Sequence, residues 1–203
     1  MPNQNSDDSI FSMIKLGLIL ALYAVVSCTV LALVNNFTAA KIAENQEAKV
    51  NQAMASFFTG DEYSFTVKTD YEPKEFGSIK VDNLIIAEAD GKIAGGACQV
   101  SGPTYDTATI LVGMAADGKI TGLQFLKNTD SPGFGLKASD STFKMSNGKT
   151  FYGQFVGKNA KDGFVAGETF DAISGATITS NGVASLLKAA TDLLFEYVGG
   201  QDE

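Results

Sequence analysis

The run from Leu16 to Val34 constrains this chain more than any other feature, because it contains no charged residue. A helix rises about 1.5 Å per residue, so a helical run of this length nearly crosses the ~30 Å hydrocarbon core of a bilayer. We predict a flexible amino terminus over residues 1–10, a single transmembrane helix over 11–35 and a juxtamembrane helix over 36–58. The lipid bilayer is therefore an expected partner.

A cleaved signal peptide is the alternative interpretation of this run, and it would release a secreted domain. The residues between Phe37 and Lys41 are the nearest imitation of a cleavage site. The run is long for the apolar part of a signal peptide, which favours retention of the helix. Basic residues do not decide its orientation, because Lys15 precedes the run while Lys41 and Lys49 follow it.

The composition excludes several classes of chemistry. The chain has no histidine, which removes the commonest general base and metal ligand and excludes a Ser-His-Asp arrangement. Its two cysteines, Cys28 and Cys98, are too few and too far apart for a zinc or iron–sulfur site, so we expect no metal. Acidic residues outnumber basic ones, 23 to 15, which argues against nucleic acid as a partner.

Two Asp-Gly pairs, Asp90-Gly91 and Asp117-Gly118, each separate two apolar runs. This is the strongest short-range signal for a β-hairpin. We predict that 84–88 pairs with 93–100 and that 107–114 pairs with 120–126, which gives an antiparallel sheet. Further along the chain, a short helix is expected near 137–143.

The last predicted element is a helix from about Ser180 to Val198. Its apolar residues recur at helical spacing on one side, so it should cover the sheet. The fold class is therefore α+β: one amino-terminal transmembrane helix, then a single domain, residues 59–203, with an antiparallel sheet covered by helices.

Just before this helix, the segment Asp171–Thr177 and the residues after it concentrate four hydroxyl side chains. They are Ser174, Thr177, Thr179 and Ser180. Because the apolar periodicity begins only at Val183, Thr179 or Ser180 fits the N-cap position best. Thr177 lies upstream, where the free N–H groups of a helix start favour a phosphate. Helix capping and phosphate anchoring are thus both open on local chemistry.

The order Asp-x-x-Ser-Gly-Ala-Thr at 171–177 resembles the flavinylation motif of the FMN-carrying subunits of Rnf-type electron-transport complexes and of sodium-pumping NADH:quinone reductases. The resemblance implies a covalent phosphoester between FMN and Thr177. It also implies that a flavin transferase recognises Asp171 during maturation, and that Ser174, Gly175, Ala176, Thr179 and Ser180 surround the cofactor.

A second stretch, Ser131-Pro132-Gly133-Phe134-Gly135, resembles the loop that lies near the flavin in this family. Pro before Gly also predicts a type II turn with a positive φ at Gly133. The chain carries Asn128 where histidine is common and Asp130 where glutamate is usual. The resemblance extends to Tyr105, as an aromatic neighbour of the flavin, and Lys137 is the nearest basic candidate for a phosphate.

The resemblance implies a function as an electron-relay subunit of an Rnf-type, ion-translocating ferredoxin:NAD oxidoreductase. Such a subunit works with other membrane subunits, has no independent turnover and holds its flavin domain on the extracytoplasmic side of the cell (inner) membrane. Two alternatives remain open at this point. One is the FMN subunit of a sodium-translocating NADH:quinone reductase; the other is a non-catalytic, membrane-tethered assembly or binding module.

Overall fold

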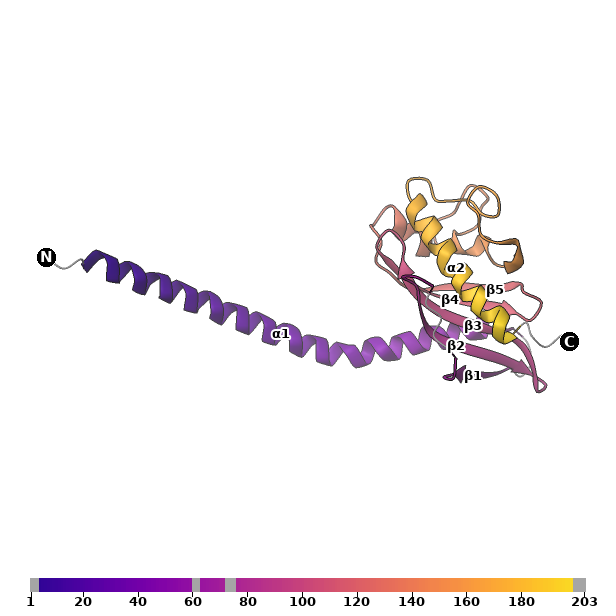
Figure 1. The fold of residues 1–203 in the computed structure, drawn as a ribbon, viewed down its shortest axis with the longest axis horizontal. Helices are drawn as coiled ribbons and strands as arrows, with labels where there is room; N and C mark the ends of the chain where they lie inside the picture. The colour runs from indigo at the N-terminus through magenta and orange to yellow at the C-terminus, as the bar shows by residue number, and fades with distance from the viewer. Residues whose placement is uncertain (1–3, 60–62, 72–75, 199–203) are drawn as a thin grey trace. The chain divides into compact units, whose positions relative to one another are not determined.

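The computed structural model describes residues 4–59, 63–71 and 76–198, with side chains from residue 11 onward. The chain divides into two compact units, residues 1–47 and 48–203. Figure 1 shows a long amino-terminal helix, a sheet and a carboxy-terminal helix. The α+β class predicted from the sequence is confirmed.

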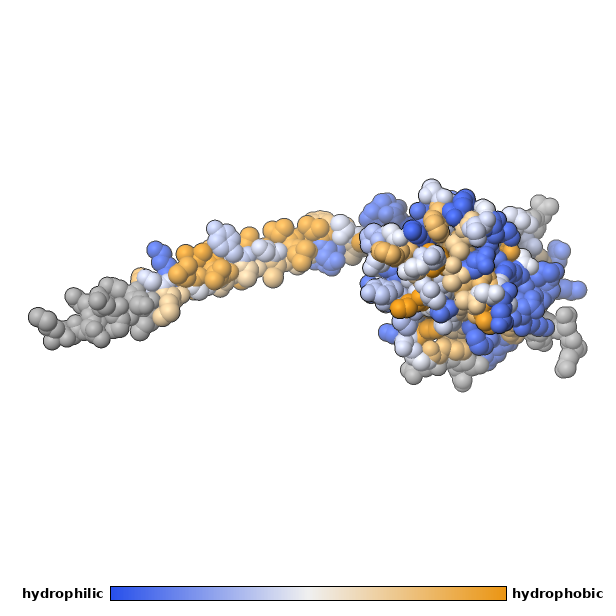
Figure 2. All heavy atoms as spheres, turned by 90° about the horizontal axis from the view of Figure 1, so that it is seen from above, coloured by the Kyte–Doolittle hydropathy of each residue, from blue (hydrophilic) through white to orange (hydrophobic). Residues whose placement is uncertain are grey.

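Helix α1 runs without interruption over Gln4–Phe57. It therefore joins the predicted transmembrane and juxtamembrane helices and starts earlier than residue 11; residues 1–3 of the predicted flexible terminus lie outside the described residues. Its apolar side chains are exposed in the span, as the band of hydrophobic atoms along the helix in Figure 2 shows. Within that span, the Thr29 hydroxyl donates to the Val25 carbonyl, which satisfies a polar group without water.

This is the one helix, among the described residues, that is long and apolar enough to cross a membrane. Its last turns belong to the second unit, because the boundary between the units falls after Glu47. By its packing, the second unit begins about ten residues before the predicted domain boundary at 59. The first strand of the sheet begins after that boundary.

The sheet has five antiparallel strands in the order in which they occur along the chain. They are β1 (Ser64–Lys68), β2 (Lys80–Ala89), β3 (Lys92–Pro103), β4 (Thr107–Ala115) and β5 (Ile120–Asn128). Both predicted hairpins, β2–β3 and β4–β5, are confirmed. At the first, Asp90 and Gly91 both have positive φ, 53° and 73°, as a type I′ turn requires.

Both faces of the sheet are covered within the second unit. Alternation along β2 sends Leu84 and Ile86 to the face packed against helix α2 (Thr177–Val198), while Ile85 and Ala87 face the end of α1. On that second face the ring of Phe57 lies directly over Gly122, where an added Cβ would fall only 1.9 Å from a ring carbon. The missing side chain is what lets the end of α1 pack on the strands.

A long connection links β5 to α2 and contains three short 3-10 helices. They are η1 (Gly135–Ser139), η2 (Tyr152–Gln154) and η3 (Ala160–Asp162). The helix predicted near 137–143 is the turn η1, which is shorter and begins two residues earlier. The rings of Phe151, Phe155 and Phe170 pack against one another and are buried, with centroids 5.2 to 6.2 Å apart. This cluster anchors the connection on the main core.

Helix α2 begins at Thr177, so the predicted start near Ser180, with Thr179 or Ser180 as N-cap, is wrong. The N–H of Ser180 already donates to the carbonyl of Ala176, which makes Ala176 the N-cap residue. The apolar pattern missed this first turn because its inward positions carry hydroxyls instead of hydrocarbon. Ser180 Oγ donates to the Ala176 carbonyl and accepts from the N–H of Ile173.

Candidate functional site

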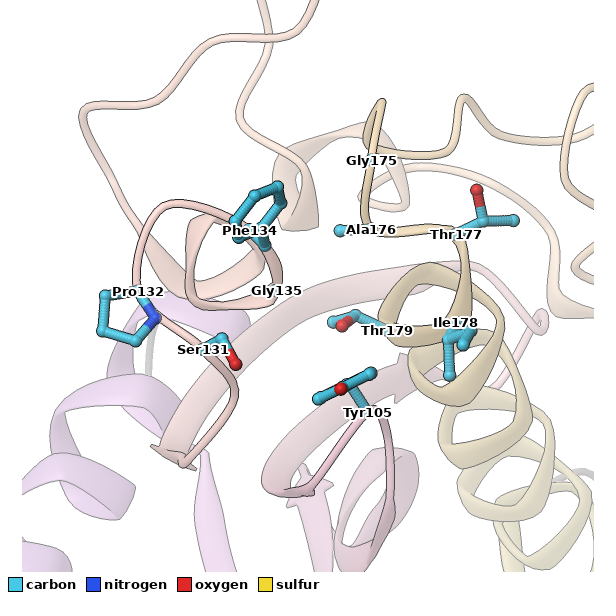
Figure 3. A pocket seen from close by; sticks show the side chains of 10 residues that line it. All are labelled: Tyr105, Ser131, Pro132, Phe134, Gly135, Gly175, Ala176, Thr177, Ile178 and Thr179. Carbon is cyan, nitrogen blue, oxygen red and sulfur yellow. The ribbon is translucent and has the colours of Figure 1, made fainter.

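A pocket of about 580 Å³ opens at the start of α2. Three segments that are far apart in the sequence surround it: the turn between β3 and β4, the loop after β5 and the start of α2 (Figure 3). Its lining residues are Tyr105, Ser131, Pro132, Phe134, Gly135, Gly175, Ala176, Thr177, Ile178 and Thr179. Nine of the ten belong to the set named from the sequence, and Ile178 was missed.

The helix start gives this pocket an electropositive edge. Thr177, Ile178 and Thr179 are the first three residues of α2, so their N–H groups have no acceptor inside the helix. These groups and the positive end of the helix dipole favour an anion beside them. The structure thus brings a phosphate-binding edge to the residues that the motif marks.

The four candidate hydroxyls fall into different environments. Thr179 and Ser180 are almost completely buried, and their hydroxyls are engaged by Asp130 and by the backbone of Ala176 respectively. Ser174 is exposed but lies outside the set of lining residues. Thr177 is exposed and lines the pocket, as Figure 3 shows at the edge formed by α2. Of the four, Thr177 alone combines access from solvent with a place in the pocket.

The loop after β5 forms the opposite side. Gly133 has a φ of 80°, as the predicted turn requires, and the N–H of Phe134 donates to the carbonyl of Ser131. Asn128 fixes the end of this loop, because its amide donates to the carbonyl of Gly135 and to the hydroxyl of Ser139. The asparagine at this position therefore stabilises the loop through hydrogen bonds.

The side chain of Asp130 lies behind the pocket and ties all three segments together. Its Oδ1 accepts from the Thr104 hydroxyl at 2.6 Å and from the Asp106 N–H at 2.8 Å, and its Oδ2 accepts from the Thr179 hydroxyl at 2.5 Å. Only 3% of the residue is exposed. Sequence reasoning noted Asp130 as a substitution in a motif but missed this role, because its partners are up to 49 residues away.

The pKa of Asp130 follows from two opposing effects. Burial raises it, but the hydrogen bonds from Thr104, Thr179 and the backbone N–H groups of Asp106 and Tyr105 outweigh burial and hold the pKa below its ordinary value. The group behind the pocket is therefore a carboxylate at neutral pH.

Gly182 sets how closely α2 approaches the turn that carries Tyr105. A Cβ at this position would lie 2.6 Å from the Thr104 Cα and 2.9 Å from the Pro103 carbonyl oxygen. Both atoms belong to the backbone, so they cannot move aside as a side chain would. Gly182, which follows the hydroxyl-rich segment, is thus required for α2 to pack closely against the turn that carries Tyr105.

Gly133, Ser174 and Ser180 are not among the lining residues, and two further predicted residues, Lys137 and Asp171, also lie outside the lining. The Lys137 ammonium sits over the ring of Phe143, 5.3 Å from its centroid, and is not among the lining residues. Asp171 is exposed and borders a second, polar cavity of about 330 Å³, where its carboxylate accepts from the amide of Asn147. Gln154 holds the backbone of Asp171 from both sides, at 2.8 and 3.0 Å, so the start of the motif is rigidly placed.

Comparison with known proteins places this geometry in a family. Residues 104–192 match the FMN-binding domain, and residues 8–56 match the RnfG N-terminal region. The chain is 33% identical to the G subunit of the Na(+)-translocating ferredoxin:NAD(+) oxidoreductase complex of Acetobacterium woodii, over 84% of this chain and 86% of that protein. The chain belongs to the RnfG family.

Other RnfG relatives agree with this assignment. The G subunit of the ion-translocating oxidoreductase complex of Pseudomonas aeruginosa is 29% identical, covering 88% of this chain and 87% of that protein. The corresponding protein of Vibrio cholerae is 27% identical, and 90% of each chain is covered. The recognition made from two short motifs is confirmed, and the RnfG N-terminal match favours the Rnf alternative over the quinone reductase. With the apolar span of α1, it indicates a membrane-anchored electron-transfer protein.

The pocket fits the cofactor that the FMN-binding domain match names. Its volume lies within the ~300–1,000 Å³ usual for cofactor sites, and its walls offer two exposed aromatic rings, Tyr105 and Phe134, beside the N–H groups of the helix start. A Cβ at Gly175, whose φ is 79°, would lie 3.6 Å from the Phe134 ring, so a side chain there would narrow the opening. The space is kept open by glycine between an aromatic surface and an anion-binding edge.

Proposed function

We propose that this protein carries FMN on Thr177 through a phosphoester and relays electrons within an ion-translocating oxidoreductase complex. The ferredoxin:NAD reaction is taken from the name of the Acetobacterium relative. The observation that supports Thr177 as the attachment site is the difference between the four hydroxyl residues: Thr177 is exposed, lines the pocket and is the first residue of α2.

The attachment is a transfer of the FMN phosphoryl group from an activated flavin nucleotide. A bond forms between Thr177 Oγ1 and phosphorus, the bond from phosphorus to the donor's leaving group breaks, and the hydroxyl proton is released. The free N–H groups of Thr177, Ile178 and Thr179 would favour the negative charge of such a phosphate. Bound FMN supplies the redox chemistry, and the ester prevents it from dissociating between redox states.

The chain itself orients this cofactor and limits access to it. Tyr105 and Phe134 offer faces for ring stacking, and the loop from Ser131 to Gly135 supplies the opposite wall. Lys137 remains a candidate partner for the phosphate only through a rotamer other than the one over Phe143. Because the pocket is open on one side, a flavin held there would remain accessible to neighbouring subunits.

The attachment proposal is tested by intact mass of the full chain from cells that contain a flavin transferase. The wild-type protein and Thr179→Ala should gain the mass of FMN less one water, and Thr177→Ala should not. Fluorescence of the band after denaturing electrophoresis gives an independent readout of a covalent flavin. An unmodified wild-type chain would favour the alternative of a tethered binding module.

We also propose that the flavin transferase is a maturation partner that reads Asp171, since this carboxylate is exposed and its backbone is fixed by Gln154. Asp171→Ala should lower modification while leaving the melting temperature close to wild type. Asp162→Ala, an exposed carboxylate in η3, is the matched control. Equal modification of both variants would remove Asp171 from the proposal.

The flavin domain is proposed to lie on the extracytoplasmic side, with the other membrane subunits of the complex as partners. A protease added to cells whose cell envelope is permeabilised outside an intact cytoplasmic membrane should then cleave the domain without lysis of the cells. Protection of the domain until the cells are lysed would place it in the cytoplasm instead.

A further inference from the structure

Asp130 is a buried charge that the attachment chemistry does not use. It accepts hydrogen bonds from Thr104, from Asp106 and from Thr179, and these donors come from two different segments of the pocket wall. Burial of a carboxylate is costly unless hydrogen bonds compensate it.

Within the part of the chain that the structure describes, no ion pair neutralises this charge. The ion pairs found among the described residues are Lys41–Glu44, Lys119–Asp117 and Lys188–Asp192, and none involves Asp130. Its compensation comes from dipoles, namely the three donors and the start of α2, in whose first turn Thr179 lies. Dipoles stabilise a charge locally, whereas its field still extends into the neighbouring space.

The pocket is that neighbouring space. Thr179 lines it and donates to Asp130 Oδ2, and Gly135 lines it from the other side. A Cβ on Gly135 would lie 2.5 Å from the same Oδ2 atom, so the loop backbone passes directly over the carboxylate. The carboxylate of Asp130 thus lies directly behind two residues of the pocket wall, Thr179 and Gly135.

We propose that Asp130 is a positioning residue that lowers the reduction potential of the flavin held in this pocket, by maintaining a fixed negative charge behind its wall. The inference rests on the proposed function, because it needs a flavin in the pocket. Reduction adds negative charge to the pocket, and a nearby carboxylate opposes that addition. Neutralising Asp130 therefore makes reduction easier and moves the midpoint potential upward.

Asp130→Asn is a suitable variant because the hydrogen-bond network can accommodate it. The asparagine oxygen can accept from the Asp106 N–H and the Thr104 hydroxyl, while its amide donates to the Thr179 hydroxyl. That hydroxyl can change from donor to acceptor by turning its proton toward a backbone carbonyl. The variant therefore removes the charge and keeps the size and most of the bonds.

The measurement is a spectroelectrochemical titration of the full-length, flavin-loaded chain in detergent. A unit charge roughly 10 Å from a redox centre, at an effective dielectric constant of about 20, changes an equilibrium constant roughly 15-fold. That corresponds to an upward shift of about 70 mV for a one-electron step, at 59 mV per tenfold change. Asp192→Asn, an exposed carboxylate further along α2, is the control and should leave the potential unchanged because solvent and salt screen it.

A second variant separates charge from structure. Thr104→Val removes one donor but leaves the carboxylate, so it should lower the melting temperature with a much smaller change in potential than Asp130→Asn. If Asp130→Asn does not load flavin, Asp130→Ser repeats the test, since serine removes the charge and leaves room for a water.

A loaded, neutral variant with the wild-type potential would overturn the proposal. So would a pair of neutral variants that melt cooperatively near the wild-type temperature but never load, because Asp130 would then act in loading. Loss of a cooperative melt in both would reduce Asp130 to a folding residue. None of these results resembles failure of the proposed function, which is a wild-type chain without any flavin.

Discussion

Gly182→Ala is the substitution for which the structure predicts the opposite of the usual result. In a helix interior, replacing glycine by alanine commonly stabilises by about 1 kcal/mol, because glycine has more backbone freedom to lose. Gly182 lies inside α2, so helix propensity alone predicts a more stable protein. The tertiary contact predicts a less stable one.

The magnitude follows from the atoms that the new Cβ would meet. It would lie 2.6 Å from the Thr104 Cα and 2.9 Å from the Pro103 carbonyl oxygen, well inside the ~3.5–4.0 Å at which carbon atoms attract. Because both are backbone atoms, relief requires α2 and the turn to separate, and overpacking of this kind costs about 1–3 kcal/mol. Subtracting the propensity gain leaves a net loss of about 1 kcal/mol, or about 2–4 °C for a domain of this size.

The assay is thermal unfolding of the full chain, followed by near-ultraviolet circular dichroism of its tyrosines. Asn181→Ala is the matched control, since Asn181 is the exposed neighbour of Gly182 on the same helix. This variant should be slightly more stable than the wild-type protein, because alanine favours a helix more than asparagine does. Separation of α2 from the turn also moves Tyr105, so the absorbance of a bound flavin should change in Gly182→Ala alone. A Gly182→Ala protein that melts at or above the wild-type temperature would refute the close contact between α2 and the turn.

Two further outcomes are expected from the titratable groups. Burial, and to a smaller extent the charge of Asp82, raise the pKa of the Cys98 thiol to about 12. The folded protein should therefore not react with iodoacetamide at this cysteine at about pH 8, whereas the unfolded chain should. Peptide mapping of the alkylated sites measures this, and rapid labelling in the folded state would contradict the burial of β3. The pKa of Asp130 is lowered in the folded state against about 3.9 in the unfolded chain, so its stabilisation is fully present above about pH 4 and is lost as the pH falls further. The difference in melting temperature between wild type and Asp130→Asn should therefore shrink as the pH falls below about 4, and a constant difference would mean that Asp130 is not ionised.

Local signals predicted the elements whose cause is local. The Asp-Gly pairs predicted both hairpins, and at the first of them the positive φ of Asp90 and Gly91 depends only on neighbouring residues. The uncharged run from Leu16 to Val34 likewise predicted a helix, and the motif at 171–177 predicted the family. These features are encoded in contiguous residues, so composition and spacing suffice to find them.

The connection between β5 and α2 shows where local reasoning ended. The sequence there is rich in glycine and serine and suggests no core, yet Phe151, Phe155 and Phe170 form a buried cluster. These rings are separated by irregular backbone, so they have no periodicity, and only the tertiary fold brings them together.

The sequence by itself determined the membrane helix, the antiparallel sheet and the residues beside which a flavin is expected. Only the tertiary structure decided that α2 starts at Thr177, that Thr179 and Ser180 are buried and engaged, and that Asp130 binds two segments of the pocket wall from behind. The physical reason is the range of the interactions. A turn is decided by its own dihedral angles, whereas a buried carboxylate is decided by donors such as Thr104 and Thr179, which only the completed fold places around it.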